Sequence, residues 1–312
     1  MNSYISNSKP LLISYFGLLM LLLMIFGLCS ELLVRNQVLE QDSFQYHVDL
    51  FNSSTSPNIS LGDSHVARGF LPPEDMVNLS YPSEGIEHFN LKIQKYFNNK
   101  PAGKIILTAD PHLFAPYRTA RSIENYSDNF RNIGKTDLAI WNDRYRPQLV
   151  AYWRSYLLSG GKLHTSIEKT KNGTLLSPGD ISLKGARYLN FEARSRIDLH
   201  SINGDNSGKL MAKYEEMLAY LTKKNADICM VTFPLSAAYL LAFDEYATPE
   251  AKANRKAVLE KFQLLAHRYG ARYIDHQRAV TVSNLFRDVD HLNRDAAPAY
   301  SRKLFSACFD GR

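Results

Sequence analysis

Two short motifs in this chain hold the residue types of a serine nucleophile and its base. Ser64 stands in Gly-Asp-Ser-His at 62–65, where a short apolar strand is expected to pass into a helix. At such a position the hydroxyl faces a cleft, and the serine N–H lies at a helix N-terminus where it can stabilise a developing oxyanion. A hydroxyl is a poor nucleophile at neutral pH, so this serine requires a base. The neighbours Asp63 and His65 are expected to cap and to begin that helix.

The expected base is His291, which stands out among nine histidines because Asp288 precedes it by three residues. On a turn, this spacing lets the carboxylate accept a hydrogen bond from the imidazole, which fixes the tautomer and stabilises the imidazolium. Asp290 is the sequence neighbour of His291 and is expected to point elsewhere. Each motif alone has a simpler explanation, a turn or a helix start, but together and in this order they predict a Ser64–His291–Asp288 catalytic triad.

The pattern along the chain predicts an α/β domain that positions these motifs. Short apolar runs separated by helical patterns indicate five strands at 58–61, 76–79, 104–108, 227–233 and 271–274, and helices at 84–97, 209–224, 249–269 and 296–305. Strands that alternate with helices form a parallel sheet with helices on both faces, and ligands bind beyond the carboxyl ends of its strands. The irregular stretch at about 115–206 is expected to be an insertion that forms a lid or a substrate-binding cap.

The order of the motifs resembles that of the SGNH (GDSL-like) hydrolase superfamily, with Gly-Asp-Ser-His at 62–65 and Asp-Val-Asp-His-Leu-Asn at 288–293. Behind an N-terminal anchor, it resembles more narrowly the membrane-anchored branch. That branch includes the alginate O-acetylation proteins and the protein that helps to D-alanylate teichoic acid. The resemblance covers roughly residues 58–310. It implies a three-layer α/β/α flavodoxin-like fold, and acyl transfer or hydrolysis on polysaccharides or lipids.

The resemblance also implies further donors to an oxyanion hole. The second sequence block of the family supplies a glycine N–H, for which Gly85 is the candidate here. The third block normally reads Gly-x-Asn-Asp, whereas this chain has Ala-Asp-Pro-His at 109–112 and no asparagine. His112 could replace the missing donor, or Asn78 could reach into the site.

The N-terminal segment predicts a membrane anchor. Residues 11–29 form a nineteen-residue stretch without charge, which at about 1.5 Å per residue nearly spans a hydrocarbon core of roughly 30 Å. A cleaved signal peptide is the alternative, but no small-x-small site follows the stretch. The short N-terminal stub and the large domain after it favour a single-pass protein with its domain outside the cytoplasm. We therefore expect an anchor at 1–33, a polar stalk at 34–55 and a catalytic domain at 56–312.

Composition narrows the partners and cofactors. The net charge is +6, but Lys and Arg are interspersed with Asp and Glu, so no basic block suggests nucleic acid. A mild positive charge suits anionic lipid or an acidic polysaccharide, and it is also common by chance. The three cysteines do not form a disulfide framework, and a single bridge between Cys229 and Cys308 stays open. No Cys/His spacing predicts a metal, and no motif predicts another cofactor.

These features predict an extracytoplasmic serine esterase or O-acyltransferase that acts on a cell-surface polysaccharide or a related polymer. Tethering favours the transferase, and the resemblance implies a multi-pass membrane O-acyltransferase as its partner. The alternative is a non-catalytic polysaccharide-binding or scaffold protein that keeps the fold, for which the missing asparagine is the best support. Tyr145 and Trp153 could stack on sugar rings or simply pack the insertion.

Overall fold

The computed structural model describes residues 8–118, 137–163, 167–202 and 204–310. These residues fall into two compact units. The first unit comprises the described parts of 1–46 and 131–165, and the second comprises those of 47–130 and 166–312.

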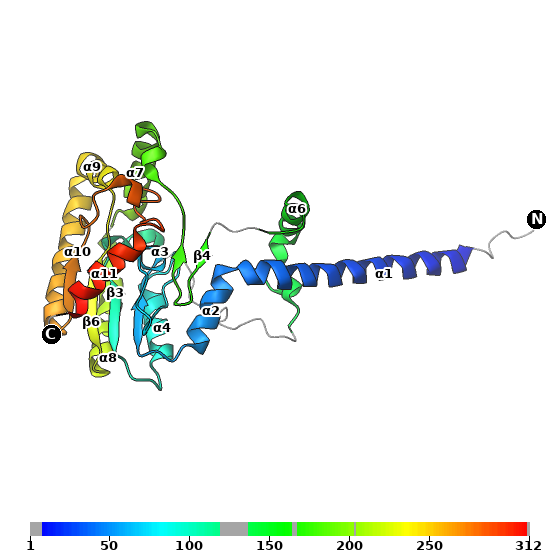
Figure 1. Ribbon diagram of the computed structural model, residues 1–312, viewed down its shortest axis with the longest axis horizontal. Helices are drawn as coiled ribbons and strands as arrows, with labels where there is room; N and C mark the ends of the chain where they lie inside the picture. The colour runs from blue at the N-terminus through cyan, green and yellow to red at the C-terminus, as the bar shows by residue number, and fades with distance from the viewer. Residues whose placement is uncertain (1–7, 119–136, 164–166, 203, 311–312) are drawn as a thin grey trace, which may run out of the picture. The chain divides into compact units, whose positions relative to one another are not determined.

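The second unit is built on a five-stranded parallel sheet (Figure 1). Its strands are β1 (Asn58–Leu61), β2 (Met76–Asn78), β3 (Lys104–Thr108), β6 (Asp227–Thr232) and β7 (Arg272–Asp275), in the order β2-β1-β3-β6-β7. Every neighbouring pair in this sheet is parallel. The predicted α/β class and five-stranded parallel sheet are confirmed. The middle residues of the central strands β3 and β6, 105–107 and 228–231, are apolar and buried, as expected for strands covered on both faces.

Helices pack on both faces of this sheet. The elements are α3 (Ser64–Gly69), α4 (Ile86–Tyr96), α8 (Gly204–Lys223), α10 (Pro249–Arg268) and α11 (Ala297–Phe309). Val66 of α3 and Leu304 of α11 share a core cluster with Ile106, which places both helices on one face. Ile274 of β7 packs against the same cluster, and side chains alternate between the faces of a strand, so Tyr273 points to the other face. There its ring lies 6.2 Å from that of Phe262 of α10.

A second layer of elements follows the carboxyl ends of the strands. It contains the 3-10 turns η2 (Pro111–Phe114), η3 (Pro116–Arg118), η6 (Ile181–Leu183) and η7 (Ser283–Leu285), the hairpin β4 (Glu168–Lys169)–β5 (Leu175–Leu176), and the helices α7 (Ala186–His200) and α9 (Ala237–Tyr246). Helices α7 and α9 pack on each other through Ala193, Ile197 and Tyr239.

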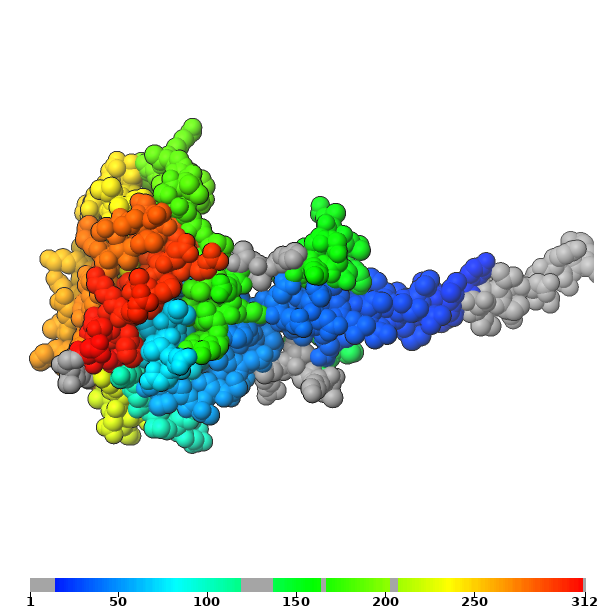
Figure 2. Space-filling model, in the orientation of Figure 1, coloured from blue at the N-terminus to red at the C-terminus, as the bar shows by residue number. Residues whose placement is uncertain are grey.

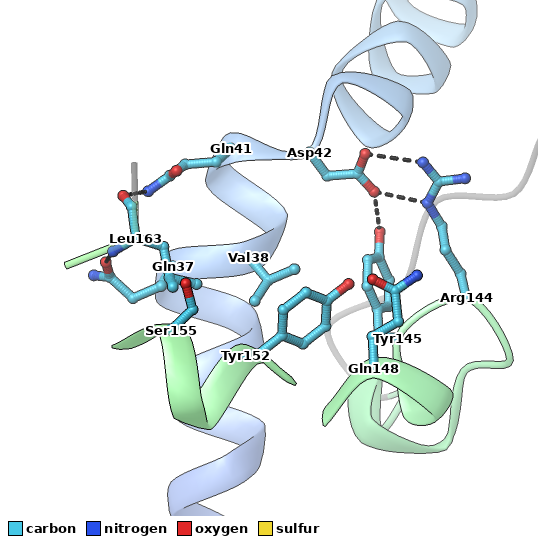
Figure 3. Close-up of a pocket in the computed structure, with 10 residues that line it drawn as sticks. All are labelled: Gln37, Val38, Gln41, Asp42, Arg144, Tyr145, Gln148, Tyr152, Ser155 and Leu163. Carbon is cyan, nitrogen blue, oxygen red and sulfur yellow. Dashed lines mark hydrogen bonds and ion pairs between the residues drawn. The ribbon is translucent and has the colours of Figure 1, made fainter. Parts of the chain in front are cut away.

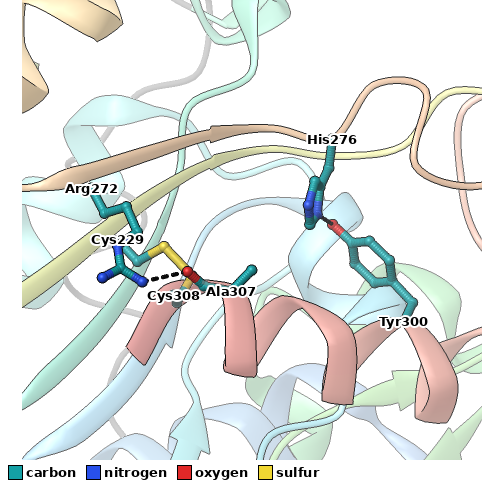
Figure 4. The surroundings of a disulfide bond; sticks show 6 residues. All are labelled: Cys229, Arg272, His276, Tyr300, Ala307 and Cys308. Carbon is teal, nitrogen blue, oxygen red and sulfur yellow. Dashed lines mark hydrogen bonds between the residues drawn. A yellow bond between two sulfur atoms is a disulfide. The ribbon is translucent and has the colours of Figure 1, made fainter. Parts of the chain in front are cut away.

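A disulfide joins Cys229 of β6 to Cys308 near the end of α11 (Figure 4). Both residues are buried, and the bridge joins two positions that are 79 residues apart in the sequence. Beside it, the Arg272 guanidinium donates to the Ala307 carbonyl. The bridge that the sequence left open is therefore formed, and it fixes the C-terminal helix on the sheet. In the space-filling view, α11 and the segment around α3 lie side by side (Figure 2).

The first unit is organised around the N-terminal helix α1 (Ser8–Leu33), which continues as the π-helix η1 (Val34–Leu39). The stretch 15–39 is long and apolar enough to cross a membrane, and an 18-residue window within it has a mean hydropathy of 2.4. Its apolar side chains stay largely exposed up to Leu28, whereas Ser30 is fully buried. From there the turn η4 (Ala139–Trp141) and the helix α6 (Leu149–Leu158) pack against it, and the turn η5 (Arg146–Gln148) packs against both of them.

Hydrogen bonds lock this packing. The Glu31 carboxylate accepts from the N–H groups of Ala139 and Ile140 at 3.0 Å each. A cavity of about 470 Å³ opens between η1 and the segment 144–163 (Figure 3). At its rim, Asp42 accepts from Arg144 at 2.8 Å and from the Tyr145 hydroxyl at 2.7 Å.

The regions expected to be stalk and insertion have regular structure in part. Within 34–55, η1 and α2 (Ser43–Ser53) are helical, and from His47 onward α2 belongs to the second unit. Val48 and Phe51 are buried there, three residues apart on one helical face. The insertion at about 115–206 divides, with 137–163 in the first unit and 167–202 in the second.

Removing the disulfide should destabilise the second unit. We expect Cys229→Ala/Cys308→Ala to lower the free energy of unfolding by about 2–5 kcal/mol, because a long closed loop restricts the unfolded chain. Chemical denaturation of the full chain in detergent measures this, with Cys29→Ser as the matched control because Cys29 is a free thiol. An unchanged midpoint in the double variant would show that the bridge does not form in solution.

Candidate active site

Ser64 begins α3 directly after β1, at a turn that only glycine permits. A Cβ on Gly62 would lie 2.3 Å from Val66 Cγ2 and 2.9 Å from Thr108. The turn can therefore approach β3 closely enough to present the serine at the carboxyl edge of the sheet. Ser64 is partly exposed, whereas its neighbours on both sides are buried.

The structure brings the three predicted triad residues together in one chain of hydrogen bonds. His291 Nε2 lies 2.8 Å from Ser64 Oγ, and His291 Nδ1 lies 2.7 Å from Asp288 Oδ1. Asp288 Oδ1 also accepts from the His291 N–H at 2.9 Å, so the carboxylate holds both the backbone and the ring of this turn. This is the arrangement a serine nucleophile, a general base and an orienting carboxylate require. The catalytic roles of these residues stay a prediction.

Asp290 does not point away from the ring, and the expectation that it would was wrong. Its Oδ1 lies 3.0 Å from His291 Nδ1, the nitrogen that also faces Asp288. The physical reason is the tight closure of the loop, in which the Arg287 N–H donates to the His291 carbonyl at 2.9 Å. Residues 288 and 290 then approach the same imidazole from two sides. Asp288 makes the aligned hydrogen bond, and Asp290 contributes its charge.

Behind the triad lies a buried network of carboxylates and imidazoles. His65 Nδ1 lies 2.9 Å from Asp110 Oδ2, and His65 Nε2 lies 3.9 Å from Asp290 Oδ2. Asp63 does cap α3, because its Oδ1 accepts from the His65 N–H at 3.0 Å. Its other oxygen is 2.7 Å from His112 Nε2 and also pairs with the Arg118 guanidinium.

Charge neighbours decide the titration of this network. Burial alone would lower the pKa of His291, but the nearby carboxylates of Asp290 and Asp288 outweigh it and raise that pKa. The pKa of His65 is raised well above its ordinary value, because Asp110 and Asp63 outweigh burial in the same way. The imidazolium form of His291 is thus stabilised by fixed negative charge.

Two other histidines near the network show the opposite behaviour. Burial lowers the pKa of His112, although the Asp63 charge opposes this. Burial also lowers the pKa of His200 well below its ordinary value, and the His112 charge acts in the same direction. The rings of His112 and His200 stack at 4.6 Å. The two histidines therefore favour the neutral form, whereas His65 and His291 favour the charged form.

The predicted oxyanion donors differ in what their groups already bind. Asn78 is fully buried and donates to the Val66 and Phe70 carbonyls at 3.0 and 3.1 Å, so its amide holds α3 and is not free to stabilise an oxyanion. Gly85 caps the N-terminus of α4, and its N–H already donates to His88 Nδ1 at 3.1 Å.

His112 faces Asp63, as described above. By contrast, the Ser64 N–H donates to no group within the described residues. Ser64 itself is therefore the best placed oxyanion donor in the part of the chain described.

Two sets of side chains have donor atoms close enough together to hold a metal ion. They are Asp63, His65, Asp110 and His112, and His65, Asp290 and His291. These atoms already pair with one another, and the guanidinium of Arg118 contacts Asp63. A fixed cation at hydrogen-bond distance opposes the binding of a second cation, so the geometry suits protons better than a metal.

Sequence reasoning missed several members of the network. Asp110 follows β3, and its position at a strand end was a usable signal. Arg118 and His200 lie in the irregular stretch, where no periodicity indicates which side chains turn inward.

No protein-family model matches the sequence, and no curated protein matches it.

The two carboxylates around His291 make a spectroscopic prediction. We expect the pKa of His291 to lie above the ordinary histidine value of about 6.5, and Asp290→Asn to lower it toward or below that value, since one charge beside the imidazolium is lost. Histidine-selective NMR titration of the full chain measures this. Glu260→Gln, which removes an exposed carboxylate on α10, is the control. An unaltered titration in Asp290→Asn would contradict the placement of Asp290.

Proposed function

We propose that this chain is a membrane-anchored serine hydrolase or O-acyltransferase of the SGNH type that works outside the cytoplasm. The observation that carries the proposal is the hydrogen-bonded chain from Ser64 Oγ through His291 to Asp288. The strand order β2-β1-β3-β6-β7 and the place of the two motifs at the carboxyl edge fit a three-layer, flavodoxin-like arrangement.

The geometry suggests a two-step acyl transfer. Ser64 Oγ attacks the carbonyl carbon of an acyl ester while His291 Nε2 takes its proton, and the Ser64 N–H stabilises the oxyanion. Collapse of the tetrahedral intermediate breaks the ester bond, and His291 returns the proton to the leaving alcohol. In the second step His291 deprotonates the acceptor hydroxyl, which attacks the acyl-serine. As the bond from the acyl carbon to Ser64 Oγ breaks, His291 returns this proton to Ser64 Oγ, which regenerates the serine and the neutral base. Asp288 and Asp290 stabilise the imidazolium in both steps.

Two features support a location outside the cytoplasm. Disulfides persist in oxidising compartments and are rare in the cytosol, and Cys229 and Cys308 form one here. The apolar helix α1 is long enough to tether the chain. A tethered enzyme suits a polymer at the cell surface, with a sugar hydroxyl as acceptor for a transferase or water for an esterase. A multi-pass membrane O-acyltransferase as donor partner is an analogy from the resemblance.

A non-catalytic polysaccharide-binding or scaffold protein is the second candidate. Its support is the Ala-Asp-Pro-His sequence at 109–112, where Asp110 and His112 bind other side chains and offer no free donor to an oxyanion. Labelling of Ser64 by a fluorophosphonate separates the two candidates, because only an activated serine reacts.

Loss of the nucleophile or the base should abolish turnover. We expect Ser64→Ala and His291→Ala each to lower kcat for acetyl-ester hydrolysis by roughly 10⁴-fold or more, and the double variant to add little, because the residues act as a unit. Asp288→Asn should lose less than Ser64→Ala, since this carboxylate neither attacks the substrate nor carries the proton. The exposed Ser159→Ala is the control. Full activity in Ser64→Ala would end the serine mechanism.

The pH profile should report the raised pKa of His291. The base works only when neutral, so kcat/KM should rise with pH through a midpoint above about 6.5. Asp290→Asn should move this midpoint to lower pH. A rising limb that stays in place in that variant would assign the limb to another group.

Topology is testable by fusion reporters. With the C-terminus outside, a C-terminal alkaline phosphatase fusion should be active in a bacterial host and a β-galactosidase fusion inactive, because each reporter works on one side of the membrane only. The reverse pattern would overturn the extracytoplasmic location.

A further inference from the structure

The helix α6 has an unusual surface for a helix in water. Eight of the ten residues in LVAYWRSYLL are apolar or aromatic, and none of the ten is buried. A helix that is apolar on all sides is ordinarily found inside a protein core or in contact with lipid. The packing of the first unit leaves α6 without the cover that its composition requires.

Five exposed apolar side chains of the segment 138–158 make up a candidate surface, which we call the apolar platform: Leu138, Trp141, Val150, Leu157 and Leu158. Val150 is 83% exposed, Leu158 78% and Trp141 64%. Val150 and Leu157 lie seven residues apart and so share one face of α6. Exposed apolar surface of this kind marks a contact with a protein or a membrane.

The position of α6 along α1 identifies which contact this is. The Trp153 ring stacks on Phe26 at 6.0 Å, and its Nε1 donates to Ser30 Oγ at 3.0 Å. Phe26 belongs to the exposed apolar stretch of α1, and Ser30 is the place where α1 becomes covered by protein. Figure 2 shows the atoms of α6 directly beside those of α1. The helix α6 therefore lies level with the C-terminal end of the uncharged stretch 11–29 of α1.

We infer that the apolar platform inserts into the interfacial layer of the bilayer that α1 crosses. Tryptophan and tyrosine concentrate at this depth, and an interfacial helix buries its apolar face by roughly 5–10 Å. Arg154 is the single charge in α6, and its long side chain can extend to lipid phosphates. The inference rests on the membrane anchor of the proposed function. The first unit then binds the membrane through a spanning helix and a surface helix together.

The chain has two tryptophans, Trp141 and Trp153, so its tryptophan fluorescence reports on this region alone. The full chain is reconstituted in phosphatidylcholine vesicles, with and without lipid brominated high in its acyl chains. In Trp153→Phe, we expect the remaining Trp141 emission to fall at least about twofold with brominated lipid, and to resist the water-soluble quencher acrylamide. Trp141 quenched by acrylamide and insensitive to brominated lipid would overturn the inference, because the platform would then face water.

The Trp141→Phe variant separates this inference from the proposed anchor. Its remaining Trp153 packs on Phe26 of α1 and so reports insertion of the span itself. Quenching of Trp153 without quenching of Trp141 would refute the platform and leave the anchor intact. Failure of both, with the protein extracted by alkaline carbonate, would refute the anchor and the inference that depends on it.

Charge substitution provides the matched test. Leu157→Glu/Leu158→Glu, made in Trp153→Phe, should reduce the quenching of Trp141 by brominated lipid at least about twofold, because carboxylates resist transfer into lipid. Leu183→Glu/Leu264→Glu alters two similarly exposed leucines of the second unit and should leave the quenching unchanged. Equal effects of the two double variants would also overturn the inference.

Discussion

The position of His291 between two buried carboxylates is the constraint on which the rest of the site depends. Asp288 and Asp290 both face one ring nitrogen, at 2.7 and 3.0 Å. Carboxylates out of contact with water cost several kcal/mol each unless they are compensated. The compensating groups continue beyond the triad, because His65 lies beside Asp290 and also pairs with Asp110. The polar interior is thus one connected network and not a set of separate pairs.

That network requires several distant segments to converge. Its members come from the β1–α3 turn, the segment after β3 and the loop before α11. A parallel sheet delivers this convergence, because the carboxyl ends of neighbouring strands share an edge. The close approach at Gly62 brings Ser64 to the edge, and the disulfide at Cys308 fixes the helix that follows the His291 loop. Core packing and site geometry are therefore coupled.

The two units solve different physical problems. The second unit shields a charged network from water, while the first organises an apolar helix and the chain that packs on its end. Glu31 shows how the first unit is organised, since its carboxylate accepts hydrogen bonds from two backbone N–H groups of the segment 139–140. A surface helix beside a spanning helix would give the first unit two attachments to one bilayer. A hydrolase or transferase that acts on a polymer at the membrane would then be held to the bilayer at two places.

The sequence by itself determined the strands, the parallel sheet and the Asp288–His291 pair, because apolar periodicity and local spacing encode them. The contact of Ser64 with His291, 227 residues away, was predicted from the order of the two motifs and is made by the fold. It did not determine the role of Asp290, since adjacency on a chain says nothing about a loop closed by a backbone hydrogen bond. Nor did it reveal that Asn78 serves the fold, or that Arg118 reaches Asp63 across 55 residues of chain. Such contacts join segments with no shared local pattern. They form only when the sheet brings the strand ends together, so tertiary structure alone decided which polar residues share the buried interior.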